Sequence, residues 1–308
     1  MIQYLVRRLL WLPVLLAIVI MITYALGLYG PGDPVKIAMG QHYDPETAAR
    51  VRHELGLDRP FFVQYGDYVW GLLHGDLGES IKYRRPVIDL IKSRLWISFQ
   101  LNAAALAVGL LIGIPLGVVA AVKHHTWLDY TIVTGSVAGI SLPTVVLAPI
   151  LLWFLAARFR ILPSGGWDGL ISTRSIMPVA VMSTGVIAVF VRQTRANMLE
   201  VIGQDYVRTA RSKGLSERVV MMVHALRNAL MPLFTIFGLM VGGLVGGTFI
   251  VEYIFGIPGI GRLGFESFFA RDYPVIMALI ILIAAAYALA NLLVDLGYTV
   301  IDPRIRYR

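Results

Sequence analysis

Apolar residues gather along this chain in six long segments, with polar and basic stretches between them. The first, residues 9–29, is long enough to cross the roughly 30 Å hydrocarbon core of a bilayer as a helix, and it is longer than a signal-peptide core. The fourth is short and is interrupted by a polar Ser-Thr-Gly triplet at 183–185. The second to sixth segments are residues 97–122, 130–157, 176–191, 233–251 and 273–296. This pattern predicts an all-α, polytopic membrane bundle of six transmembrane helices.

The distribution of charge orients this bundle. Only 15% of the residues are charged, and the net charge is +8. The excess of Lys and Arg falls mainly in the loops after the second and fourth segments and in the tail IDPRIRYR. Cytoplasmic loops of membrane proteins carry such an excess, so we expect both termini in the cytoplasm, contact with membrane lipid and no nucleic-acid partner.

This topology divides the chain into three parts. Residues 1–29 form the first transmembrane helix, residues 30–96 form one long extracytoplasmic segment, and residues 97–308 form a five-helix core with a cytoplasmic loop at 201–228. Within the outer segment, Asp44 and Gly56 are suited to begin and end a short helix whose Ala48, Val51 and Leu55 share one face. That helix either packs on the spans or meets an extracytoplasmic partner.

Two segments carry small residues at a spacing of four, which lets helix backbones approach closely in lipid. The stripes are Gly109, Gly113 and Gly117 in the second segment, and Gly238, Gly242 and Gly246 in the fifth. They serve either packing within the chain or an interface with a second membrane subunit.

Several kinds of chemistry lack their residues in this sequence. No ionisable residue falls near the centre of an apolar segment, where proton relays and ion pathways place them. There is no cysteine, no His spacing typical of a metal site and no phosphate-binding loop. We therefore expect no catalytic and no metal site in this chain, and if ATP drives it, another chain binds the ATP.

Residues 205–227, DYVRTARSKGLSERVVMMVHALR, form a polar and basic insert. Asp205 is suited to cap a helix from Tyr206 to Lys213, Gly214 to end it in a left-handed conformation, and Ser216 to cap a second helix. Arg208 and Arg211 share one face, beside an apolar patch formed by Tyr206, Val207 and Ala210. Such a helix docks into a groove on a partner or lies on anionic lipid.

This insert resembles the cytoplasmic loop of binding-protein-dependent ABC transporter permeases. The family pattern is Glu-Ala-Ala, three residues, Gly, nine residues, then Ile-x-Leu-Pro; Ala210, Gly214 and Leu226 match it, and Arg208 replaces the Glu. The whole chain is similar to the dipeptide and oligopeptide branch, first-subunit type. The segments that carry this similarity are MIQYLVRRLL, GPGDP, ELGLDRPFFVQYGDYVWGLLHGDLGES, LPSGG, HALRNALMP and FGIPGIGRLGFESFFARDYP.

The resemblance implies a multi-pass subunit of the cytoplasmic (inner) membrane that forms half of an import pathway for di- and oligopeptides. A second homologous permease, two ATPase subunits that bind ATP and Mg, and an extracytoplasmic substrate-binding protein would be its partners. The ATPase contact would be a coupling helix with Asp205, Tyr206, Arg208, Thr209, Ala210, Arg211, Lys213, Gly214 and Leu215. Arg208, Arg211 and Lys213 would pair with ATPase acids, and the missing Glu leaves one contact unassigned.

Alternatives stay open at this level. Nickel and haem are other cargoes within the broad family, and a stand-alone channel or secondary carrier is an alternative of a different class. The glycine-rich segment 253–274 reads as a turn-rich loop back to the sixth span, or as a partly re-entrant gate or contact for the binding protein. We favour docking of the binding protein there, together with the long outer segment.

Overall fold

The computed structural model describes residues 2–29, 44–54, 56 and 58–301, and the described chain is almost entirely helical. Four single helices are long and apolar enough to cross a membrane: α1 (Ile2–Tyr29), α5 (Val87–Val122), α8 (Thr173–Ile202) and α15 (Tyr273–Ile301). Two bent pairs also qualify if each is one span, namely Trp127–Ser141 with Thr144–Arg158, and Glu217–Ala229 with Met231–Val245. The described chain is therefore a membrane helix bundle with four to six spans.

The chain folds as two compact units, each with its own packing. The first combines Met1–Ser98, Val245–Phe249 and Pro258–Arg308, and the second combines Phe99–Leu244 and Ile250–Ile257. The division predicted from membrane topology, at 29 and 96, stays a prediction.

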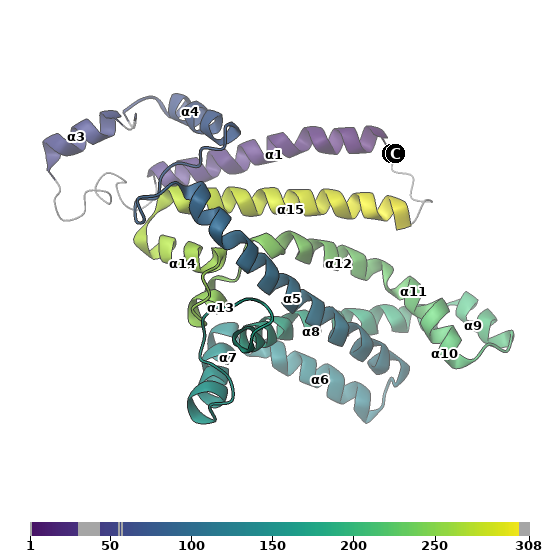
Figure 1. Cartoon of the computed structure of the whole chain (residues 1–308). Coiled ribbons are helices and arrows are strands. Elements are labelled where there is room, and N and C mark those ends of the chain that lie inside the picture. Colours follow the sequence, from purple (N-terminus) through teal and green to yellow (C-terminus); the bar gives the residue numbers. More distant parts are fainter. Residues whose placement is uncertain (1, 30–43, 55, 57, 302–308) are drawn as a thin grey trace. The chain divides into compact units, whose positions relative to one another are not determined.

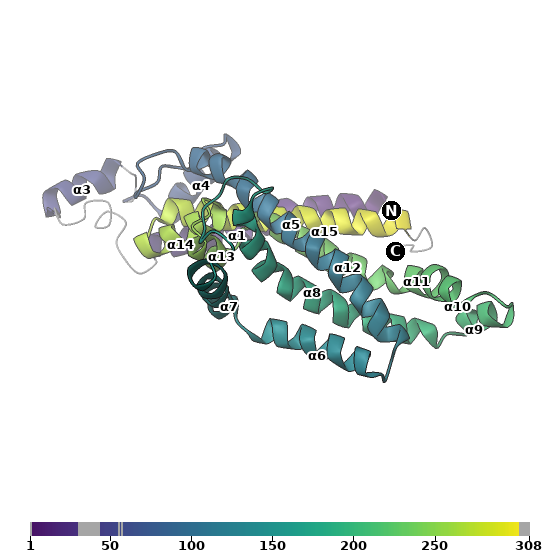
Figure 2. The ribbon, with the colours of Figure 1, turned by 60° about the horizontal axis from the view of Figure 1, so that its bottom comes forward.

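In the first unit, α1 and α15 run side by side in opposite directions, so the start of α1 and the end of α15 lie at the same end of the pair (Figures 1 and 2). The remaining helices of this unit are α3 (Pro45–Glu54), α4 (Phe61–Leu73) and α14 (Ile260–Ala270). A buried cluster joins the start of α5 to α14 and α15; it consists of Val87, Leu90, Ile91, Ile260, Leu263, Val275, Ala278 and Leu279.

In the second unit, α8 is the central helix. It packs against α6 (Trp127–Ser141), α7 (Thr144–Leu151) and α12 (Met231–Gly242). The shorter elements of this unit are the π-helices η1 (Leu152–Arg158) and η2 (Val220–Ala225), and the helices α9 (Asp205–Ser212), α10 (Glu217–Val219), α11 (Leu226–Ala229) and α13 (Phe249–Ile254). The 3₁₀ turn η3 covers Gly243–Val245.

Several predicted helix boundaries were wrong. The second span begins at Val87, ten residues before the predicted Ile97, and the fourth runs from Thr173 to Ile202 without a break. The polar triplet does not interrupt the fourth span, because Ser183 Oγ donates to Ala180 O at 3.0 Å and Thr184 Oγ1 to Val181 O at 2.8 Å. Such bonds satisfy the hydroxyls within the helix.

The third predicted span is bent by 95° between α6 and α7. Pro143 disfavours helical backbone at the residue before it, and Leu142 accordingly has φ −86° and ψ 113°. The fifth predicted span was placed at Leu233–Val251, but α12 ends at Gly242 and the chain turns through Gly246 and Gly247, the latter at φ +66°.

The predictions for the short helix after Asp44 and for the segment 253–274 had different outcomes. Asp44 caps α3 as expected, since its carboxylate accepts from Thr47 N at 2.9 Å. Leu55, which was placed on the apolar face of that helix, lies outside the described residues. The glycine-rich segment 253–274 is not a turn-rich loop, because it contains the eleven-residue helix α14.

Candidate coupling site

The basic insert folds as a short helix, a left-handed turn and a second helical stretch. Helix α9 begins at Asp205 with Gln204 at the N-cap position, so Asp205 lies in the first turn and is not the cap that the sequence predicted. Its carboxylate still favours the helix there, because the N-terminal end of a helix dipole attracts negative charge. Gly214 follows α9 with φ +75°, the conformation that was expected of it.

The inner face of α9 is fixed to the second unit's own core. Val207 and Ala210 are buried in what we call the loop cluster, which consists of Ala121, Met198, Val207, Ala210, Val220, Met221, Ala225 and Ala229. These residues come from α5, α8, α9, η2 and α11. The apolar patch predicted for docking is therefore largely covered within the chain, and only Tyr206 of that patch is exposed, with its hydroxyl accepting from Asn228 Nδ2 at 2.9 Å.

The outer face of α9 is polar and open. The side chains of Asp205 and Arg208 are 97% and 79% exposed. The other predicted contact residues exposed on this surface are Tyr206, Thr209, Arg211, Lys213 and Leu215. Arg208 Nη1 lies 3.8 Å from Asp205 Oδ1, and an ion pair this exposed contributes little stability. Arg208 is thus held only weakly by its own chain.

Arg211 has a different role from Arg208 in this geometry. Its Nη2 donates to Glu217 Oε1 at 2.8 Å and its Nε to Glu217 Oε2 at 3.2 Å, across the turn at Gly214. A two-point pair of this kind fixes orientation as well as distance. The hydrogen bond that Arg211 donates to Glu217, together with the charge of Glu217, raises the pKa of Arg211 in spite of opposing desolvation. Arg211, predicted to pair with an acid of an ATPase, is paired here within the chain and sets the angle between α9 and α10.

A second ion pair ties α8, the helix that leads into α9, to α6. Arg195 Nε donates to Asp129 Oδ1 at 2.6 Å and its Nη2 to Asp129 Oδ2 at 2.8 Å. Asp129 also accepts from the backbone N–H of His125 at 3.2 Å. The side chain of Asp129 is only 2% exposed and that of Arg195 is 27% exposed. This pair was not predicted from the sequence, where its only signal was an acid at the start of an apolar segment.

The first glycine stripe lies where α5 meets α8. A Cβ at Gly117 would lie 2.6 Å from Thr194 Cβ, and a Cβ at Gly113 would lie 2.8 Å from Phe190 Cβ. Gly109 would meet the side chain of Val186 in the same way. The contact is therefore one of close backbone approach within the chain.

The second stripe is not continuous. Gly238 and Gly242 are buried in α12. Gly246 lies in the turn after η3, and so it cannot share a helical face with the other two. Whether either stripe also serves a second membrane subunit stays a prediction.

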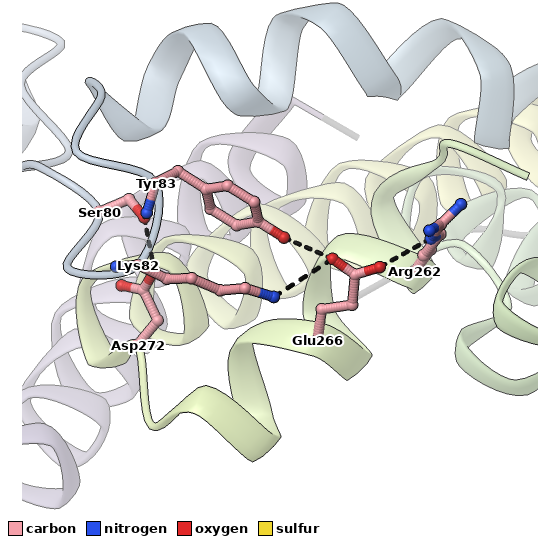
Figure 3. A network of polar contacts seen from close by, with 6 residues as sticks. All are labelled: Ser80, Lys82, Tyr83, Arg262, Glu266 and Asp272. Atoms are coloured by element: carbon pink, nitrogen blue, oxygen red, sulfur yellow. Dashed lines mark hydrogen bonds and ion pairs between the residues drawn. The ribbon is translucent and has the colours of Figure 1, made fainter.

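A polar network, shown in Figure 3, fastens the end of the long outer segment to α14. Tyr83 Oη, Lys82 Nζ and Arg262 Nε all donate to the carboxylate of Glu266, at 2.5, 3.4 and 2.7 Å. Burial would raise the pKa of Glu266, but the hydrogen bonds from Tyr83 and Arg262 and the charges of Lys82 and Arg262 outweigh it and lower that pKa to about 2. This network was not predicted, since Tyr83 and Glu266 are 183 residues apart in the sequence.

The same junction has a second fastening at Asp272. Its carboxylate accepts from Ser80 Oγ at 2.5 Å (Figure 3). It also accepts from the backbone N–H groups of Ile81 and Lys82 at 3.1 and 3.2 Å. Both Asp272 and Ser80 are buried. Residues 80–83 and 262–272, from the two segments that the sequence predicted to be extracytoplasmic, are therefore joined directly.

Comparison with known proteins decides the family. Residues 113–307 match the family model described as binding-protein-dependent transport system inner membrane component, and residues 1–102 match the model of the N-terminal part of such components. The chain belongs to this family. It is a multi-pass inner-membrane permease subunit of a binding-protein-dependent ABC importer, and membership implies ATPase and substrate-binding partners.

Three relatives show how close the similarity is. The dipeptide transport system permease protein DppB of Escherichia coli (strain K12) is 39% identical over 339 residues, with all of both chains covered. A putative peptide transport system permease protein of Brucella abortus (strain 2308) is 39% identical, with 96% of each chain covered. The glutathione transport system permease protein GsiC of Pectobacterium atrosepticum is also 39% identical, over the whole of both chains.

The fold is shared with solved structures. An inward-facing form of the MetNI methionine ABC transporter superposes with a TM-score of 0.58 at 17% identity, covering 69% of this chain and 96% of that one. At this identity the likeness concerns the fold alone.

Proposed function

We propose that this permease forms half of an import pathway for di- and oligopeptides, which a substrate-binding protein delivers from outside. The observation that carries the proposal is the group of relatives named for dipeptide, peptide and glutathione transport, each 39% identical over nearly the whole chain. A second, homologous but different permease would complete the pathway as a heterodimer. Nickel or haem remains the alternative cargo.

The proposed topology has six spans with both termini in the cytoplasm. It is supported by the antiparallel arrangement of α1 and α15, which places the start of α1 beside the end of α15, and by the basic loops. In this topology the joined segments around Glu266 and Asp272 lie on the extracytoplasmic side of the membrane, where a binding protein would dock.

Helix α9 is the proposed coupling helix. Its exposed residues, Arg208 foremost, would sit in a cleft of an ATPase subunit, while Val207 and Ala210 fix its other side to α8 and η2. Because of this fixed side, a displacement of α9 has to move α8 as well. The chain itself would not be catalytic: ATP and Mg would bind to the two ATPase subunits.

The energetic requirement follows from linkage. ATP can shift the bundle toward an outward-facing state only as far as it binds the corresponding ATPase arrangement more tightly. The arrangement of α9 provides the mechanical path for that shift, and the ion pair of Arg195 with Asp129 extends the path from α8 to α6.

The test is ATP-dependent uptake of a labelled dipeptide into proteoliposomes that contain the complete importer. Arg208→Glu should abolish most uptake, whereas Arg218→Glu, the same charge reversal at an exposed position outside α9, should retain it. Normal uptake by a well-expressed Arg208→Glu importer would remove α9 from the coupling role. Competition by unlabelled peptides, but not by nickel or haem, would support the peptide cargo, and the reverse would contradict it.

A further inference from the structure

Helix α4 lies alongside the C-terminal half of α1. Its first residue, Phe61, stacks on Tyr29 at 6.1 Å and lies 5.9 Å from Tyr24, measured between ring centroids. One turn further, Tyr65 Oη donates to the carbonyl of Ala17 at 3.0 Å. These contacts belong to one compact unit of the chain.

The positions of these contacts along α1 set the depth of α4. The apolar stretch of α1 is Leu9–Tyr29, so Ala17 lies near its middle and Tyr29 at its end. At 1.5 Å per residue, the contacts cover about 18 Å along the span, which is roughly the hydrocarbon depth of one leaflet. Side chains of α4 therefore contact α1 over the depth of one leaflet.

The buried amide of α4 at this depth has partners, as a lipid environment requires, whereas the buried hydroxyl of Tyr68 has no hydrogen-bond partner among the described residues. Gln64 accepts from Tyr24 Oη at 3.1 Å and donates from its Nε2 to Arg59 O at 2.7 Å. Gln64 is also buried.

The face of α4 that points away from α1 is apolar and uncovered. Phe62, Trp70 and Leu73 on it are 77%, 67% and 76% exposed, and Val63 is exposed beside them. An exposed apolar face of this kind marks a contact with another nonpolar surface. An exposed ion pair joins Arg59 to Asp67 of α4 at 3.3 Å, and the Arg59 side chain is long enough to keep its charge at an interface.

We propose that phospholipid covers this face, so that α4 is a helix embedded in the leaflet next to α1 and anchors the long outer segment to the membrane. The occupant follows from continuity: the exposed side of α1, including Leu15 and Ile22, carries the same kind of surface at the same depth. Under the topology proposed above, this is the outer leaflet.

The experiment measures solvent and lipid access at single sites. The chain has no cysteine, so Phe62→Cys, Trp70→Cys and Leu73→Cys each give one labelling site when cysteine-free partner subunits complete the importer. A nitroxide is attached, and the complex is placed in vesicles of phosphatidylethanolamine and phosphatidylglycerol. Collisions with oxygen, which concentrates in hydrocarbon, are compared with collisions with a water-soluble nickel chelate.

Two control sites bracket the result. Leu15→Cys on α1 reports lipid, and Glu46→Cys on the polar helix α3 reports water. We expect all three α4 sites to favour oxygen over nickel severalfold, as Leu15→Cys does. A preference for nickel, as at Glu46→Cys, would overturn the proposal, and so would low access to both reagents, which would mean a protein partner on this face. The ratio of oxygen to nickel collisions is the same in either leaflet, so it tests this proposal even if the proposed topology is wrong.

Discussion

Replacing Gly117 with alanine tests whether α5 and α8 approach as closely as the structure shows. The new Cβ would lie 2.6 Å from Thr194 Cβ and 2.8 Å from the carbonyl oxygen of Val191. Neither atom can move away by a side-chain rotation, because one is a Cβ and the other belongs to the backbone. The two helices would have to separate locally. Gly135 in α6 is the matched control, since nothing lies within 4 Å of a Cβ there.

The comparison isolates the packing contribution to the free energy of unfolding. Glycine to alanine in a helix interior stabilises by about 0.5–1 kcal/mol, and this gain is common to both variants. Overpacking a close contact costs about 1–3 kcal/mol. We therefore expect Gly117→Ala to be less stable than Gly135→Ala by about 1–3 kcal/mol, which is a difference of a few degrees in the apparent melting temperature.

The assay is thermal unfolding of the purified importer in detergent, followed by loss of the intact complex on size-exclusion chromatography. Gly139→Ala, also in open space, guards against a contact of Gly135 with a partner subunit. If Gly117→Ala melts at or above both controls, α5 and α8 do not pack this closely, and the first glycine stripe serves some other contact.

Three further predictions concern the turn, the buried ion pair and the outer network. Gly214→Val forces a β-branched residue into φ +75° and should cost on the order of 1–3 kcal/mol and most of the uptake, whereas Gly203→Val, at φ −78°, should retain uptake. Arg195→Ala should destabilise the complex by roughly 3 kcal/mol, because it leaves the buried carboxylate unpaired, and Asp129→Asn should destabilise it less. Equal melting temperatures of the two variants would contradict this. Glu266 has a depressed pKa of about 2, so its contribution to stability is complete above pH 4.5 and is lost as the pH falls toward 2; Glu266→Gln should flatten the melting temperature over that range, and an unchanged pH profile would refute it.

The apolar pattern predicted the helices well and their ends poorly. Each of the six segments is mostly helical in the structure, because a helix satisfies the backbone of a long apolar run within the run itself. The 95° bend between α6 and α7 was readable from Pro143 and was overlooked. The early start of α5 at Val87 was not readable, since its first turns are mixed in character and are fixed by contacts with α14 and α15.

Glycine was the most ambiguous signal in the sequence. In the segment 253–274 it was taken to indicate turns, but Gly261 and Gly264 lie within α14. A Cβ at Gly261 would lie 2.7 Å from the backbone nitrogen of Phe249, so the residue permits close approach of a helix to another stretch of backbone. Turn glycine and packing glycine look alike until the neighbour is known, and here the neighbour is twelve residues away.

The family pattern in the coupling loop marks the loop's own architecture. Of its matching residues, Ala210 is buried in the loop cluster, Leu226 packs against that cluster, and Gly214 adopts the left-handed turn. Arg208, which replaces the usual Glu, is instead exposed on the outer face of α9. A pattern that records inward-facing positions fixes the shape of a coupling helix, while its outward residues are free to suit a particular ATPase. Pairing specificity between permease and ATPase should therefore follow the exposed side of α9, and exchanging only those residues between related importers should exchange partner preference without loss of folding.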